Sequence, residues 1–311
     1  MSTATAWARQ VVKAMECVRV IIRSSRPPFL FLTLVCVALG ITLARTQTGR
    51  VDVGLTLLIL LGALSAHVSV NALNEYHDFK SGLDSLTSKT PFSGGSGALQ
   101  QFPQAAASVK NFGIACFLLT ILIGIILLPY AGLELLVIGG LGLLLIASYT
   151  PWLNRHPLLC LAAPGAGFGL FMVLGTYWIL AGQPDWPVVL LTLVPFFLVN
   201  NILLLNQYPD ISADKLVGRK TAPIVFGTTV TSIIYTVFSL LSYFIVIGLV
   251  AITYLPLITL VVIVPAILSF RAAKAAFELG EAVVAHPKYL AANVNAGLLT
   301  IAIITMGLWF A

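Results

Sequence analysis

Charged side chains are scarce in this sequence of 311 residues: it contains 17 Lys and Arg and 11 Asp and Glu, which together make up only 9% of the chain. Hydrophobic residues make up 59%, even without glycine. Soluble domains contain about 25% charged residues, because a folded chain must cover a large surface in contact with water. The scarcity of charge excludes soluble enzymes, disordered proteins and nucleic-acid-binding proteins, and it indicates a polytopic membrane protein.

Two further absences narrow the possible chemistry. The four cysteines are widely spaced, with no Cys-x-x-Cys pair and no cysteine–histidine ligand spacing, which argues against a disulfide framework and against a zinc site. The glycine-rich stretch at 93–97 lacks the Walker pattern, so a P-loop is not supported. Nothing in the sequence implies an obligate protein partner.

Long apolar runs predict an all-α fold, a membrane bundle of about nine transmembrane helices. A spanning helix needs about 20 mostly apolar residues, because the hydrocarbon core is about 30 Å thick and each residue rises about 1.5 Å. We expect a single transmembrane domain over 1–311. The runs that satisfy the length rule lie at 27–45, 53–78, 111–128, 132–150, 158–181, 187–208, 224–247, 250–270 and 291–310.

The positions of the basic residues predict the orientation. If the N-terminus is cytoplasmic, fifteen of the 17 Lys and Arg fall on the cytoplasmic side, and only Arg45 and Arg50 fall outside, as the positive-inside rule requires. In residues 1–26, apolar and basic side chains alternate at helical spacing, which predicts an amphipathic segment on the cytoplasmic surface. We therefore expect a multi-pass protein of a bacterial or archaeal inner membrane, with its active site facing the cytoplasm.

A polar motif occurs twice, after the second and the sixth predicted helices. The sequence reads NEYHD at 74–78 and NQYPD at 206–210, which suggests an internal duplication of 74–84 and 206–214. Asn74 and Asp78 are four apart, as are the acidic and amide residues of the second copy, and residues four apart share a helix face. Asp84 lies beyond Gly82, where the helix can end and the chain can turn back. Each copy would therefore present an amide oxygen and two carboxylates near one end of the bundle. These six residues are Asn74, Asp78, Asp84, Asn206, Asp210 and Asp214.

Carboxylates gathered at membrane depth repel one another unless a cation lies between them. Mg²⁺ prefers oxygen ligands and keeps waters and substrate phosphates in its shell. We therefore predict that the six motif residues bind Mg²⁺, that the four Asp are catalytic, and that a diphosphate bridges the ions. The cations expected to neutralise the diphosphate are Lys80, Lys89, Arg219 and Lys220. Lys80 and Lys89 are equally well explained as solvated residues at the end of a helix.

At these motifs the chain resembles the UbiA superfamily of intramembrane aromatic prenyltransferases. Residues 206–221, NQYPDISADKLVGRKT, are similar to the family signature N-x-x-x-D-x-x-x-D-x-x-x-G-[KR]-x-T. The first motif is similar to that of the menaquinone-type branch, with Glu75 where Asp is usual and Asp84 six residues after Asp78 rather than four. Arg26 and Tyr149 occupy positions that also resemble family positions, and we expect both to contact substrate.

The resemblance implies transfer of a polyprenyl group from a polyprenyl diphosphate to an aromatic acceptor, 1,4-dihydroxy-2-naphthoate, in menaquinone biosynthesis, with Mg²⁺ as cofactor. Residues 159–161 are apolar where the menaquinone-type pattern has polar or acidic residues. Other acceptors therefore stay open: 4-hydroxybenzoate, homogentisate or a non-aromatic lipid precursor. An ion-coupled transporter is the alternative from another class, because intramembrane carboxylates and repeated halves also mark transporters.

Overall fold

The computed structural model describes residues 3–87 and 89–311, with side chains from Val11 onward. This part of the chain is helical and contains no strand, which confirms the predicted all-α bundle. The helical elements are α1 (Thr3–Ser24), η1 (Pro27–Phe29), α2 (Leu30–Thr48), α3 (Val53–Ser81), η2 (Leu83–Ser85), α4 (Ala98–Gln101), η3 (Pro103–Ala105), α5 (Ala106–Ala131), α6 (Glu134–Ser148), η4 (Leu153–Arg155), α7 (Pro157–Gly165), η5 (Ala166–Leu174, a π-helix), α8 (Gly175–Ala181), α9 (Trp186–Asn206), α10 (Ile211–Leu216), α11 (Ala222–Ala251), η6 (Leu257–Val262), α12 (Ile263–Leu279), η7 (Gly280–Ala285) and α13 (Pro287–Trp309).

The number of membrane-spanning helices agrees approximately with the prediction. Among the described residues, eight helical stretches are long and apolar enough to cross a membrane. The expected run at 132–150 forms α6, an apolar helix of only 15 residues, none of which is buried. The predicted division near Pro256 falls at the turn between α11 and η6.

The ends of α3 follow from the residues that flank it. The Asp52 carboxylate caps the first turn by accepting a hydrogen bond from the Leu55 amide at 2.8 Å. Gly82 ends the helix with φ = 77°, a left-handed conformation that glycine adopts without steric penalty. The chain therefore turns directly after α3, and η2 buries Asp84 against the bundle.

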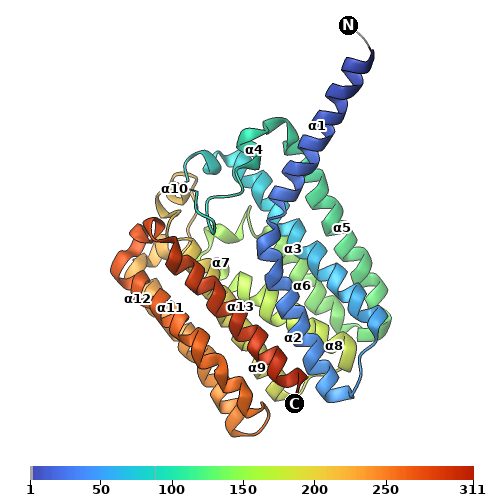
Figure 1. The fold of residues 1–311 in the computed structure, drawn as a ribbon, viewed down its shortest axis with the longest axis vertical. Coiled ribbons are helices and arrows are strands. Elements are labelled where there is room, and N and C mark those ends of the chain that lie inside the picture. The colour runs from blue at the N-terminus through green and yellow to red at the C-terminus, as the bar shows by residue number, and fades with distance from the viewer. Residues whose placement is uncertain (1–2, 88) are drawn as a thin grey trace.

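The bundle is closed by apolar packing among helices that are distant in sequence. α9 packs against α7, η5, α11 and α13, and α3 packs against α5. The largest apolar cluster includes Leu39 of α2, Leu191 of α9, Val246 of α11 and Ile304 of α13, all fully buried. Figure 1 shows α4 and α10 at the same end of this bundle, with α1 projecting from that end. The loops that follow α3 and α9 therefore meet at one end of the molecule.

The N-terminal helix α1 is only partly attached to the bundle. Val20 is fully buried near its C-terminal end, whereas Val12, Met15 and Val18 are more than half exposed. Residues 1–2 of the predicted amphipathic segment lie outside the described residues. That the segment lies on the membrane surface stays a prediction.

Candidate active site

A cavity of about 540 Å³ is enclosed mainly by α3, α5, α6, η5 and α9, and it reaches the loops that follow α3 and α9. Residues 74–84 (the first motif) and 206–214 (the second motif) therefore face the same space. The predicted site residues that line the cavity are Asn74, Asp78, Asp84, Asn206, Asp210, Asp214, Arg219, Arg26 and Tyr149.

Arg219 connects the two motifs directly. Its guanidinium donates through Nη1 to Asp214 Oδ1 at 3.1 Å and through Nη2 to Asp78 Oδ1. Both carboxylates are buried, and the Arg219 side chain is only 17% exposed. A planar guanidinium can bind two acceptors at once, so this single cation offsets one carboxylate from each motif.

Other oxygen atoms at this end of the cavity have no partner. Asp84 Oδ2, Asn206 Oδ1 and Asp210 Oδ1 are buried without a hydrogen bond among the described residues. An unsatisfied buried polar atom is costly, and this oxygen-only set suits a hard cation such as Mg²⁺. No group of three His, Cys, Asp or Glu side chains in the described ranges could hold an ion by itself. An ion bound to these oxygens would complete its shell with waters and substrate oxygens.

Burial also changes the acidity of the carboxyl groups in the loops. It raises the pKa of Asp84 to about 6, and the negative charge of Glu75 acts in the same direction. It raises the pKa of Asp210 to about 7, to which the neighbouring Asp214 also contributes, while the backbone amide of Gly94 opposes the rise. A bound cation would offset the cost of ionising these desolvated carboxyl groups, because a nearby positive charge favours the ionised form of each group.

The 93–97 loop is held across both motifs. Glu75 is fully buried, and its Oε2 accepts hydrogen bonds from the Ser96 amide at 3.0 Å and from Arg26 Nη2 at 3.3 Å. The Ser96 hydroxyl donates to Glu75 Oε1. Gly95 approaches Asp84 so closely that a Cβ atom would lie 2.6 Å from Asp84 Oδ1. Glu75, which the sequence reasoning did not assign to the site, therefore anchors this loop.

Of the four residues predicted to bind the diphosphate, one lines the cavity and three do not. Arg219 lines the cavity, whereas Lys80, Lys89 and Lys220 are exposed and do not line it. Lys89 Nζ donates to Gln100 Oε1 at 3.2 Å. The role of the three lysines stays a prediction. Arg26 brings a second guanidinium to the cavity and donates to Asn74 Oδ1 at 3.3 Å.

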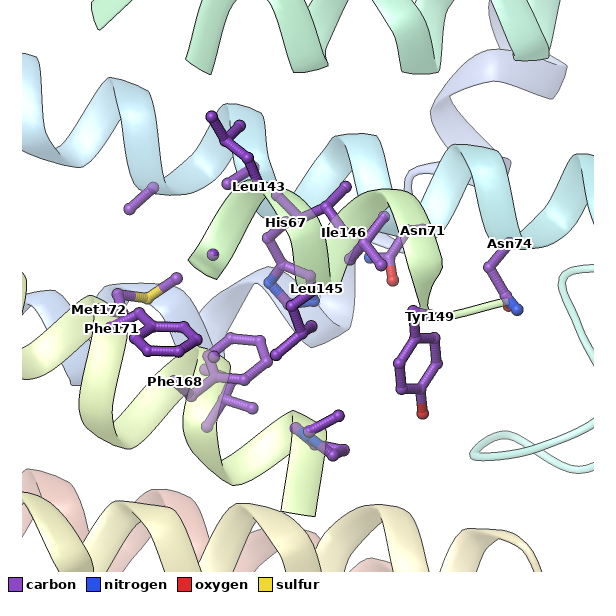
Figure 2. Close-up of a pocket in the computed structure, with 18 of the residues that line it drawn as sticks. His67, Asn71, Asn74, Leu143, Leu145, Ile146, Tyr149, Phe168, Phe171 and Met172 are labelled. Carbon is purple, nitrogen blue, oxygen red and sulfur yellow. The ribbon is translucent and has the colours of Figure 1, made fainter. Parts of the chain in front are cut away.

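Away from the carboxylates the cavity is mostly apolar. Figure 2 shows aromatic side chains of η5, Phe168 and Phe171, near the apolar residues of α6, with Tyr149 close to the polar end. His67 and Asn71 of α3 also line this part. The sequence reasoning missed these two residues as site residues, although their spacing with Asn74 places all three on one helix face.

Comparisons with known proteins agree with this architecture. A profile of the UbiA prenyltransferase family matches residues 33–289. The chain is 29% identical over 212 residues to a 1,4-dihydroxy-2-naphthoate octaprenyltransferase of Bacillus subtilis strain 168, a match that covers 65% of this chain and 64% of that protein. The chain thus spans somewhat less than two thirds of this relative.

Two solved structures have similar folds at low sequence identity. A digeranylgeranylglyceryl phosphate synthase is 16% identical with a TM-score of 0.64, covering 95% of this chain and all of that chain. A UbiA homologue from Archaeoglobus fulgidus bound to GPP and Mg²⁺ is 15% identical with a TM-score of 0.64, covering 94% of this chain and all of that chain.

Proposed function

Because the chain belongs to the UbiA prenyltransferase family, we propose that it transfers a polyprenyl group from a polyprenyl diphosphate to an aromatic acceptor. The name of the Bacillus subtilis relative favours 1,4-dihydroxy-2-naphthoate as the acceptor and menaquinone biosynthesis as the pathway. One observation carries the proposal: two acidic motifs and a bridging guanidinium meet at one end of a largely apolar cavity. This arrangement suits a substrate with a diphosphate head and a hydrocarbon tail.

The polar end would bind the diphosphate. Mg²⁺, when bound, would supply positive charge to the leaving diphosphate, and the UbiA homologue bound to GPP and Mg²⁺ supports this choice of ion. Arg219 would remain beside the phosphate oxygens as a second source of positive charge. The residues proposed to hold Mg²⁺ are Asn74, Asp78, Asp84, Asn206, Asp210 and Asp214.

The apolar part would protect the reaction from water. When the carbon–oxygen bond of the allylic diphosphate breaks, the electron pair leaves with the diphosphate, and the electron-rich ring then forms the new carbon–carbon bond. The ring regains its aromaticity when the substituted carbon releases its proton, or releases CO₂ where that carbon carries the carboxylate. Water would compete with the ring for the allylic cation. Apolar walls such as Phe168 and Phe171 exclude it.

We also propose that this end of the bundle faces the cytoplasm of a bacterial or archaeal cell. The loops of the two motifs lie together at the end from which α1 projects (Figure 1), and the positive-inside rule predicts that this end is cytoplasmic. Protease accessibility in sealed vesicles tests the assignment: a cleavage site inserted after Lys89 should be cut only from the cytoplasmic side.

A prenyl-transfer assay with the purified protein tests the proposed activity. We expect Mg²⁺-dependent release of diphosphate together with a prenylated product when a polyprenyl diphosphate is supplied with 1,4-dihydroxy-2-naphthoate, 4-hydroxybenzoate or homogentisate. Asp210→Asn should abolish the activity. Asp185→Asn is the matched control, because Asp185 caps α9 by accepting from the Val188 amide at 3.1 Å and Asn is an equally good cap. An active Asp210→Asn variant would refute the site assignment.

A further inference from the structure

Polar side chains continue along α3 beyond the acidic end of the cavity. His67, Asn71 and Asn74 line the cavity at a spacing that places them on one face of the helix. His67 precedes Asn74 by seven residues, roughly 10 Å of helix rise, so it lies far from the carboxylates and within the apolar part. A polar group at such a depth destabilises the fold unless its hydrogen-bonding atoms find partners.

The hydrogen bonds made by the protein use only part of these side chains. The His67 Nδ1 atom bonds to the Thr33 hydroxyl at 2.7 Å, and Asn71 Nδ2 donates to the Ser25 carbonyl at 3.1 Å. Within the described residues, His67 Nε2 and Asn71 Oδ1 have no hydrogen-bond partner. Neither atom is among the unpaired polar atoms that the protein buries completely, so both keep some accessible surface. Both atoms are therefore available to a molecule in the cavity.

The surroundings of His67 favour a flat ring. Phe168 packs against the His67 ring edge to face, with the ring centroids 4.9 Å apart and the planes at 78°, so two contacts fix the orientation of the imidazole. Figure 2 shows Leu145 and Phe168 close to His67, and Phe171 beyond them. A prenyl tail is hydrocarbon and offers nothing to a free Nε2 or Oδ1 atom. An aromatic molecule that carries oxygen substituents offers both an apolar face and hydrogen-bonding groups.

We propose that His67 and Asn71 bind the oxygen substituents of the aromatic acceptor and so position its ring beside the prenyl donor. The inference rests on the proposed function and deepens it, because it locates the acceptor along α3, between the level of Asn74 and the level of His67. In the neutral ring, His67 Nε2 donates when Nδ1 accepts the Thr33 hydroxyl proton, and it accepts when Nδ1 carries the proton and donates to the Thr33 oxygen. In either state it is the deepest polar contact available to the acceptor from α3.

Direct binding tests the proposal without requiring turnover. The full chain in detergent would be titrated with radiolabelled 1,4-dihydroxy-2-naphthoate, 4-hydroxybenzoate and homogentisate, and separately with a polyprenyl diphosphate and Mg²⁺. His67→Asn keeps a group near Nδ1 for Thr33 but loses the one at Nε2, and it should weaken acceptor binding about tenfold. His67→Gln places a polar group near Nε2 and should stay within about threefold of the wild type. His286→Asn, the same change at an exposed histidine, should have no effect.

The outcomes separate the inference from the proposed function. Acceptor binding that is unchanged in His67→Asn, or a loss confined to the prenyl diphosphate, would overturn the inference, as would the absence of binding of all three aromatics to the wild type. If the wild type binds an aromatic through His67 but transfers no prenyl group, the binding site stands and the proposed function fails. If the wild type transfers the group and His67→Asn keeps the wild-type KM for the acceptor, the function stands and the inference fails.

Discussion

Replacing Glu75 with Gln should loosen the 93–97 loop over the two motifs. Gln has nearly the same shape as Glu but no charge, and Glu75 is fully buried with Arg26 and Ser96 as its partners. The loop lines the cavity through Gly94 and Gly95. Loss of the anchor should therefore affect binding of the diphosphate end of the donor more than binding of the acceptor.

The size of the effect follows from the contacts. Oε2 of Glu75 accepts from the Ser96 amide at 3.0 Å and from Arg26 Nη2 at 3.3 Å. Hydrogen bonds to charged groups contribute about 1.5–3 kcal/mol and neutral ones about 0.5–1.5 kcal/mol, so weakening two of them should cost about 2 kcal/mol. If the substitution destabilises the anchored position of the 93–97 loop by this amount, kcat/KM for the donor should fall about 30-fold, since about 1.4 kcal/mol corresponds to a factor of ten.

A double-mutant cycle distinguishes this role from general destabilisation. Initial rates with varied polyprenyl diphosphate would be measured for Glu75→Gln, Ser96→Ala and the double variant, together with melting temperatures. Glu278→Gln is the control, because the Glu278 side chain is 61% exposed and forms an ion pair with the exposed Lys274 at 3.7 Å, a contact that contributes little to stability. A coupling energy of about 1 kcal/mol is expected. Additive effects, or a fall in melting temperature with unchanged KM, would refute the reasoning.

Arg219→Gln removes the guanidinium between the motifs and should lower kcat/KM by about 100-fold or more, whereas Arg219→Lys should retain more activity; equal rates in the prenyl-transfer assay would contradict this. As pH falls from 8 to 6, protons compete for Asp210 and Asp84, whose pKa values are raised to about 7 and about 6. The Mg²⁺ concentration for half-maximal rate should therefore rise, beginning near pH 7, and a constant requirement would count against the proposed ligands. Tyr235→Phe removes the hydroxyl that donates to Asn293 Oδ1 at 2.9 Å and should lower the free energy of unfolding by about 1 kcal/mol, seen as a lower melting temperature in detergent; an unchanged value would show that this bond contributes nothing.

Local sequence properties were sufficient to predict much of this architecture. A spanning helix depends on a continuous apolar run, which each of the nine predicted segments contains within itself. The turn that buries Asp84 could also be anticipated, because Gly82 is a strong helix-ending residue. The two motifs share a cavity because the loops that carry them follow helices ending on the same side of the bundle.

Contacts between distant residues could not be anticipated in the same way. Glu75 lies inside the first motif, which the sequence predicts to bind Mg²⁺. Its role as an anchor depends on how the 93–97 loop folds back, with φ = 80° at Gly94 and 72° at Gly95. His67 resembles an ordinary buried histidine until α3 is placed beside η5 (Figure 2). The π-helical geometry of residues 166–174 has no signature in an apolar sequence, yet it places Phe168 and Phe171 against the cavity.

The helix α6 is short and exposed, and it forms one wall of the cavity. Its 15 residues rise roughly 22 Å, less than the hydrocarbon thickness of about 30 Å. One side of the helix lines the cavity, while Val137 and Leu144 are more than 60% exposed. The α6 helix therefore lies between the cavity and the acyl chains that would surround the bundle. For a lipid-soluble substrate the relevant variable is its mole fraction in the bilayer, so added inert lipid would dilute it even when the volume of the solution stays the same.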